Sequence, residues 1–174
     1  MNEVFDVVNL LDQVVGKEKR IIVHKKNLLH RAVHILIRRS SGNWVIQQRS
    51  EEKDLDPYLW TSSCSGHVDA GENYKEAAVR ECIEELGVTV REHSLKEILR
   101  CSPCRETGNE FIRVYLLLSD QEIKFDRREI LKIRELKLSK LSNLIKSHSG
   151  QFSHSFRHVF SLTHEILLNE RGLS

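Results

Sequence analysis

One stretch of the chain, residues 66–88, limits the possible folds more than any other part of the sequence. It reads GHVDAGENYKEAAVRECIEELGV, a loop that begins with glycine and is followed by residues with helical spacing. On a helical wheel with about 100° per residue, Glu84 and Glu85 fall on either side of Glu81. A separate arc holds an apolar set, which comprises Ala78, Val79, Cys82, Ile83 and Leu86. The spacing therefore predicts a helix over 73–86 with one buried face and another that carries three carboxylates.

Three neighbouring carboxylates on a helix favour a specific use, because like charges one turn apart repel each other. Oxygen ligands suit Mg²⁺ and Mn²⁺, and these ions usually complete their shells with substrate phosphates. A solvated acidic face is the alternative that spacing alone leaves open. The pattern thus indicates either a hard-cation site beside a glycine-rich turn or a plain polar surface.

The rest of the chain alternates strand signals with a few helical ones. Strand-like runs occupy Val4–Val8, 13–15, His30–Arg38, 44–49, 88–90, 95–100 and Glu110–Leu118. The turn residues at 40–43 predict that the third and fourth of these runs form a hairpin. Gly87 is placed to end the acidic helix, and helical spacing recurs over 139–147 and 156–169. This order predicts an α/β fold with a mixed sheet between helices, and we expect one domain over 1–174.

Composition narrows the class of protein further. The chain has 174 residues, 40% of them hydrophobic, and a formal net charge of +2. These values exclude a disordered chain and argue against a nucleic-acid polymer as partner. No apolar run reaches the roughly 18–20 residues of a membrane span, and the N-terminus does not resemble a signal peptide. With only four cysteines, we expect a cytoplasmic protein with reduced thiols and no membrane partner. The oligomeric state stays open, a homodimer included.

The acidic stretch resembles the Nudix box, whose pattern is G-x5-E-x7-R-E-U-x-E-E-x-G-U with U an aliphatic residue. The matching residues are Gly66, Glu72, Arg80, Glu81, Glu84, Glu85, Gly87 and Val88. Cys82 stands at the first aliphatic position as a small apolar substitute. A match of this length has little chance of being accidental.

This resemblance implies a Nudix-type α/β/α sandwich that hydrolyses a nucleoside diphosphate linked to another group, with Mg²⁺ or Mn²⁺ as cofactor. By the family pattern, Glu81, Glu84 and Glu85 are metal ligands, and the backbone carbonyl of Gly66 can add another. Glu84 is also a candidate for the catalytic step. The pattern further implies that Glu72 and Arg80 form a salt bridge that holds the loop against the helix.

Beyond the box, the chain resembles the Nudix branch related to isopentenyl-diphosphate isomerase, a proton-transfer enzyme. The resemblance implies that Arg49 and Lys53 hold the diphosphate. Of the metal-binding histidines of that branch, His30 and His67 are matched. Glu110 matches one carboxylate of a pair, and Glu85 matches an acid that the isomerase retains on the helix.

The departures from the isomerase pattern favour hydrolysis. Its essential cysteine aligns with Ser65, and a hydroxyl is a poor proton donor compared with a thiol. The partner carboxylate of Glu110 aligns with Gly108, and His24 is one residue out of register. The isomerase helix also lacks the acids that stand here at Glu81 and Glu84. Isomerisation is therefore the alternative function, and a non-catalytic nucleotide-binding module is a third.

Some positions stay open from the sequence. The general base can be Glu110, which we prefer, or Glu129. A second metal at the histidines is not decided by the sequence. The CxxC pair of Cys101 and Cys104 is half of a zinc site, and a strand end with a turn explains it more simply. The substrate is a small-molecule diphosphate whose identity no motif gives.

Overall fold

The centre of the molecule is a mixed sheet built on two long parallel strands. We describe residues 3–169 of a computed structural model. Strand β3 (His30–Arg38) runs parallel to β8 (Glu110–Leu118), in a register that places His30 opposite Glu110. On the outer side of β8, β7 (Lys96–Cys101) is antiparallel, and the short β6 (Cys64–His67) pairs antiparallel with β3.

The predicted hairpin forms only at its turn. Strand β4 (Asn43–Arg49) pairs with β3 at a single position, Arg38 opposite Trp44. The two strands then separate, and β6 pairs with residues 32–35 of β3 in place of β4. Strand β4 instead pairs along its whole length with β9 (Ile130–Lys137) and at one end with β5 (Trp60–Thr61).

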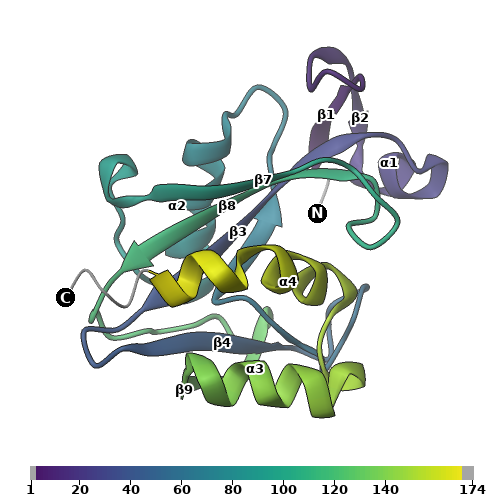
Figure 1. Ribbon diagram of the computed structural model, residues 1–174. Coiled ribbons are helices and arrows are strands. Elements are labelled where there is room, and N and C mark those ends of the chain that lie inside the picture. Colours follow the sequence, from purple (N-terminus) through teal and green to yellow (C-terminus); the bar gives the residue numbers. More distant parts are fainter. Residues whose placement is uncertain (1–2, 170–174) are drawn as a thin grey trace.

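Helices cover both faces of this sheet, so the predicted α/β/α sandwich with a mixed sheet is confirmed (Figure 1). Side chains alternate along β3 because successive residues of a strand point to opposite faces. Val33, Ile35 and Ile37 pack beneath α2 (Tyr74–Leu86). On the opposite face, a second apolar cluster joins β3 to α3 (Leu138–Ser147) and α4 (His154–Asn169).

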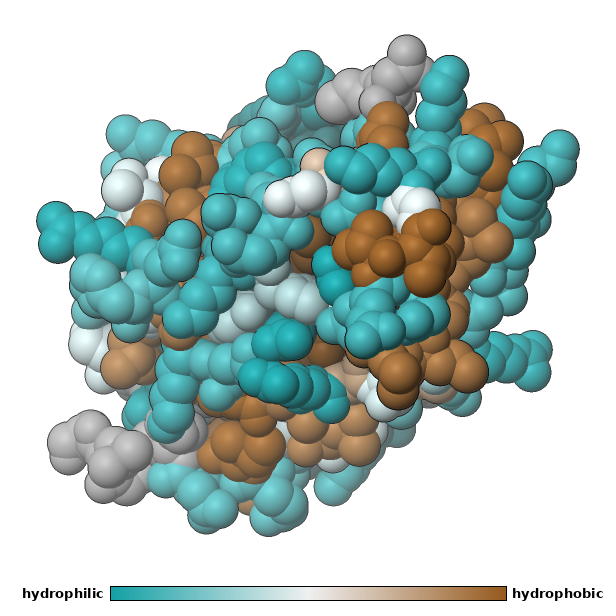
Figure 2. Space-filling view, turned by 90° about the horizontal axis from the view of Figure 1, so that it is seen from above, coloured by the Kyte–Doolittle hydropathy of each residue, from teal (hydrophilic) through white to brown (hydrophobic). Residues whose placement is uncertain are grey.

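A small N-terminal unit lies against the end of the sheet that carries His30. It consists of β1 (Val4–Val8), β2 (Val14–Lys19) and the seven-residue helix α1 (Arg20–Lys26). Several of its apolar side chains are exposed, among them Leu10, Leu11, Val15 and Ile21. Figure 2 looks onto this end of the molecule and shows brown groups interspersed with teal ones.

The predicted strand over 88–90 does not form, although Val88 and Val90 are buried as its alternation requires. The N–H of Val88 donates to the carbonyl of Cys82 and closes the end of α2. The side chain of Gln121 bonds both the N–H and the C=O of Thr89 in place of a neighbouring strand. Two short 3-10 helices, η1 (Glu92–Ser94) and η2 (Ser149–Gln151), complete the elements. None of the described helices is long and apolar enough to cross a membrane.

The apolar arc of α2 is buried as predicted, with one correction. Ala78, Cys82 and Leu86 have no exposed surface, whereas Ile83 is 50% exposed. Ile83 lies at the outer edge of the arc, where the sheet does not reach. The arc that contacts the sheet is therefore narrower than the wheel suggests.

Truncation of the buried arc should destabilise the fold. We expect Leu86→Ala to lower the free energy of unfolding by about 2–5 kcal/mol, because it leaves a cavity beneath α2. Ile83→Ala on the exposed side is the matched control and should change stability by less than about 0.5 kcal/mol. Urea denaturation measures both values, and equal effects of the two substitutions would contradict this packing.

Candidate active site

Both ends of α2 are fixed by local interactions that the sequence encodes. The Asn73 side chain accepts hydrogen bonds from the N–H groups of Lys75 and Glu76, and the Glu76 carboxylate accepts from the N–H of Asn73. This capping box satisfies donors that have no partner within the helix. Gly87 ends the helix with φ 64°, a conformation that glycine adopts without strain. These caps set where α2 begins and ends, and so they fix the positions of its carboxylates relative to the sheet.

Strand β6 separates two different chemical environments. Its residues alternate, so Cys64 and Gly66 face α2 while Ser65 and His67 face the opposite side. The register agrees with this, because Gly66 lies opposite Val33, which belongs to the core beneath α2. Functional groups thus lie on both sides of one short strand.

On the α2 side, Glu81 lies directly against the backbone of Gly66. A Cβ atom at position 66 would come within 2.1 Å of the Glu81 carboxylate. Only glycine leaves room for this approach, which explains why this position of β6 has no side chain. The arrangement brings a carboxylate and a backbone segment to one point, as expected for two groups of one ligand set.

Glu85 is the buried acid of the site. It is 4% exposed, and it accepts hydrogen bonds from Gln47 Nε2 at 3.0 Å and from Cys64 Sγ at 3.3 Å. Burial raises the pKa of Glu85. Burial also raises the pKa of Glu81 to about 8, and the charge of Glu85 adds to this effect against the opposing charge of Arg80. Arg80 offsets only part of this effect, so these carboxylates fit a divalent cation, which would compensate for both.

Arg80 holds the outer part of the same site together. Its guanidinium contacts Glu72 Oε1 at 3.0 Å, Glu81 Oε1 at 2.7 Å and Glu84 Oε2 at 3.3 Å. It also donates to the carbonyl of His67 at 2.9 Å. The predicted salt bridge between Glu72 and Arg80 is confirmed. The three acids in the last two turns of α2 therefore differ, with Glu85 buried, Glu81 half-buried and Glu84 61% exposed.

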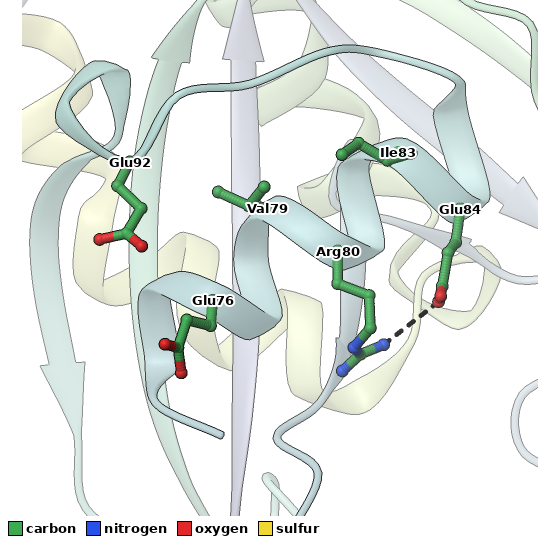
Figure 3. A pocket seen from close by; sticks show the side chains of 6 residues that line it. All are labelled: Glu76, Val79, Arg80, Ile83, Glu84 and Glu92. Carbon is green, nitrogen blue, oxygen red and sulfur yellow. Dashed lines mark hydrogen bonds and ion pairs between the residues drawn. The ribbon is translucent and has the colours of Figure 1, made fainter. Parts of the chain in front are cut away.

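Figure 3 shows the solvent side of α2, where Glu84 points toward Arg80. A shallow hollow of about 400 Å³ lies there. Its lining consists of Glu76, Val79, Arg80, Ile83, Glu84 and Glu92. Glu81 and Glu85 do not line it, and its walls carry only one cation. Of the three acids of the motif, only Glu84 therefore opens into this larger hollow.

A smaller hollow of about 120 Å³ lies on the opposite face of β6. Arg49, Ser65, Gly66, His67 and Glu110 line it, together with His34 and Ser155. A bulge at the end of β4 directs Arg49 into this hollow, where its Nε donates to the carbonyl of Leu55 at 2.9 Å. Two of the predicted site residues, Arg49 and Glu110, are thus brought together with Gly66.

The other predicted substrate residue, Lys53, lies outside both hollows. Its ammonium forms an ion pair with Glu129, and both charges act on the carboxyl of Glu85. Lys53 is therefore near the buried acid of α2 rather than beside Glu110. Catalytic candidates Glu84 and Glu110 are also on different sides of β6, so the structure does not bring them together.

Three histidines and Glu110 form a compact cluster that the sequence only suggested. Ring nitrogens of His24, His30 and His67 lie within 4.8 Å of one another. His67 Nε2 donates to Glu110 Oε1 at 3.0 Å, and His30 Nε2 is 3.4 Å from the same oxygen. His24 joins the others because α1, which the sequence did not predict, carries it there.

The lowered pKa values of His24 and Glu110 favour a neutral imidazole and a charged carboxylate, which are both suitable metal ligands. His30 Nδ1 is 2.9 Å from the carbonyl of Leu28, and its Nε2 faces Glu110. Burial opposes the charge of Glu110, but the bonds from His30 and His67 outweigh it and lower the pKa of Glu110. Burial lowers the pKa of His24 to about 4, and its buried Nε2 has no hydrogen-bond partner. These donors fit an imidazole-preferring metal ion better than Mg²⁺.

Sequence reasoning missed Gln47 and the hydrogen-bond partners of His34. Gln47 belongs to no motif. The alternation of β4 places it on the same face as Val45, which packs beneath α2, and this was the available signal. His34 is buried and neutral, because burial lowers its pKa to about 4, and its ring bonds the hydroxyls of Ser62 and Ser155. Ser155 comes from α4, more than a hundred residues later, so no local signal reveals the contact.

Comparison with known proteins gives a consistent picture. The family model of the NUDIX domain matches residues 28–157. A Nudix hydrolase of Deinococcus radiodurans is 36% identical over 129 residues, covering 74% of this chain and 75% of that protein. An isopentenyl-diphosphate Delta-isomerase of Serratia proteamaculans is 34% identical over 122 residues, covering 69% and 68%. The crystal structure of DR0079 from Deinococcus radiodurans has a TM-score of 0.72 at 32% identity and covers 84% of this chain and 90% of its own.

The raised carboxyl pKa values predict how stability depends on pH without metal. A folded pKa of about 8 for Glu81, against an ordinary 4.5, means that the folded state binds more protons. Stability should therefore fall as pH rises through this interval, by up to about 1.4 kcal/mol per pH unit. Between pH ~6.5 and ~8, above the range in which His24 and His34 titrate, Glu85→Gln should reduce this slope.

Chemical denaturation in EDTA at several pH values measures the slope. Glu122→Gln is the control, because Glu122 is exposed and pairs only with Lys124 in the described ion pairs. We expect the control to keep the wild-type slope. An unchanged slope in Glu85→Gln would contradict the effect of the Glu85 charge on the pKa of Glu81.

Proposed function

The chain belongs to the NUDIX domain family, and we propose that it is a divalent-metal-dependent hydrolase that cleaves the diphosphate linkage of a nucleoside diphosphate joined to another group. The observation that carries the proposal is a pair of acids with raised pKa values, Glu81 against Gly66 and Glu85 buried beneath α2. Two such acids are costly in an apolar setting unless a cation accompanies them. Relatives that are named Nudix hydrolases support the assignment.

We propose Glu81, Glu84, Glu85 and the carbonyl of Gly66 as the residues that hold Mg²⁺ or Mn²⁺. When bound, such an ion neutralises diphosphate charge and activates a water molecule. Gln47 and Cys64 keep the Glu85 carboxylate in place, and Arg80 does the same for Glu81 and Glu84. Binding then requires Arg80 to give up part of its contact with these acids while it keeps its contact with Glu72.

Two basic residues would bind the phosphates from opposite sides of β6. Arg49 presents a guanidinium in the hollow that also contains Gly66, where its fork can hold two phosphate oxygens. Lys53 is close to Glu85 and is paired with Glu129. An incoming phosphate can compete with Glu129 for the ammonium, which would free the Glu129 carboxylate.

Two carboxylates are candidates for the general base, Glu110 and Glu129. Glu110 shares its hollow with Arg49, but its lowered pKa makes it a weak proton acceptor. Glu129 lies beside Lys53, near the acids of α2. Replacement of each by Gln distinguishes them, because the pH–rate profile should lose its acidic limb only in the variant that lacks the base.

Isomerisation of a prenyl diphosphate is the second candidate function. The cluster of His24, His30, His67 and Glu110 favours it, as does the similarity to a named isomerase. Ser65, which lines the same hollow, lacks the acidity that a proton-transfer residue at this position needs. We therefore rank isomerisation below hydrolysis.

We further propose that residues 1–174 form one Nudix domain that acts on a small-molecule diphosphate in the cytoplasm. The four cysteines are free, and reduced thiols are usual in that compartment. No nucleic-acid polymer is required by this proposal. The oligomeric state stays open, with a homodimer as one arrangement.

Activity should depend on the metal and on the acids of α2. We expect a panel of nucleoside di- and triphosphates, nucleotide sugars and prenyl diphosphates to include a substrate from which phosphate or pyrophosphate is released. EDTA should abolish this release, and Mg²⁺ or Mn²⁺ should restore it. Glu84→Gln and Glu85→Gln should lower turnover by about 10²-fold or more, while Glu122→Gln should match the wild type. Full activity in excess EDTA would overturn the proposal.

Substitution of Ser65 separates hydrolysis from isomerisation. A hydrolase needs no proton donor at this position, so Ser65→Ala should leave hydrolysis nearly unchanged. An isomerase should convert isopentenyl diphosphate to its allylic isomer, and Ser65→Cys should raise that rate by supplying a thiol. Isomerisation by the wild-type protein without hydrolysis of any compound in the panel would reverse the ranking.

A further inference from the structure

A third group of metal-ligating side chains lies away from α2 and away from the histidine cluster. Cys104 and Glu106 are in the loop between β7 and β8, and His158 is on α4. One ligand atom from each residue lies within 4.8 Å of the others. We propose that Cys104, Glu106 and His158 form a binding site for a zinc-class transition-metal ion.

The geometry of the first two ligands is close to what such an ion requires. Cys104 Sγ and His158 Nε2 are 3.7 Å apart. With bonds of about 2.3 Å to sulfur and about 2.0–2.1 Å to nitrogen, a tetrahedral ion places these two atoms about 3.5 Å apart. An ion can therefore be inserted between them with a shift of a few tenths of an ångström. A carboxylate oxygen of exposed Glu106 lies within 4.8 Å of both atoms and can supply the third ligand.

The loop is organised so that Cys104 keeps this position. The buried hydroxyl of Thr107 accepts from the N–H of Cys104 at 3.0 Å and is 3.1 Å from the carbonyl of the same residue. It also reaches the carbonyl of Glu110 at 3.2 Å, which ties the loop to the start of β8. On the other side, Val159 and Phe160 anchor α4 in the core next to His158. Both ligands thus come from fixed backbone.

The donor set determines the class of ion. Thiolate and imidazole are soft to intermediate ligands and favour Zn²⁺ over Mg²⁺ and Mn²⁺, which prefer oxygen. Three protein ligands leave a fourth position for water. Cys101, the other member of the CxxC pair, is packed in the apolar core between the sheet and α4 and is not needed in this set. In this proposal the CxxC motif therefore supplies one thiolate ligand, from Cys104, and not two.

An ion at this position would connect two segments that border the smaller hollow. The loop leads directly into Glu110, and α4 carries Ser155, and both residues line that hollow. The contact of Cys104 with His158 already joins the loop to α4 here. Metal binding would add a strong link between them and so stiffen one wall of the hollow.

Cobalt spectroscopy tests the proposal independently of any enzymatic activity. Co²⁺ replaces Zn²⁺ in sites of this kind, and a cobalt–thiolate bond produces a charge-transfer band in the near ultraviolet. We expect one such band per chain, lost when a stoichiometric amount of Zn²⁺ is added. Cys104→Ser should abolish the band, whereas Cys101→Ser and Cys82→Ser should keep it. Circular dichroism confirms that each variant is folded.

A second ligand provides an independent check. Loss of an outer-shell partner alone weakens metal affinity by roughly 10–100-fold, so His158→Gln should weaken Zn²⁺ binding by at least about tenfold. His164→Gln, on the same helix but outside the cluster, should leave the affinity unchanged. Absence of the thiolate band in the wild type, or its survival in Cys104→Ser, would overturn the proposal.

Discussion

The site depends on one physical constraint, the burial of Glu85 between α2 and the sheet. A carboxylate in this position is stable only with hydrogen bonds, and Gln47 and Cys64 supply them. The next acid, Glu81, lies against Gly66 because the same helix packing brings it there. Removal of the capping groups or of the apolar arc would release both acids together. The fold therefore holds together two acids whose charged forms a cation would stabilise.

Strand β6 gives the molecule two chemical faces from four residues. Cys64 and Gly66 contact the acids of α2, while Ser65 and His67 belong to a hollow with Glu110 and Arg49. The first face suits hydrolysis of a diphosphate, and the second resembles what proton transfer in an isomerase would need. Ser65 decides our ranking, because without a thiol the second face lacks an acid of suitable strength. Similarity to both named hydrolases and a named isomerase is consistent with this double character.

Local features of the fold could be predicted from the sequence, whereas distant pairings could not. The limits of α2 followed from Asn73, Gly87 and the helical spacing, all of which act within a few residues. The partner of β4 could not be predicted, because β9 lies some eighty residues later in the chain. In addition, β9 is mostly exposed, so its apolar and polar residues alternate only weakly. For the same reason the sequence matched His30 and His67 to a metal pattern but left His24 out of register. Its position depends on α1, a short helix without apolar periodicity.

The location of bound Mn²⁺ tests the central claim most directly. Anomalous diffraction from crystals soaked in Mn²⁺ would show each ion without reference to activity or substrate. Our account predicts a peak between the carboxylates of Glu81 and Glu85 and the carbonyl of Gly66. A peak only among His24, His30, His67 and Glu110, with none at α2, would contradict it.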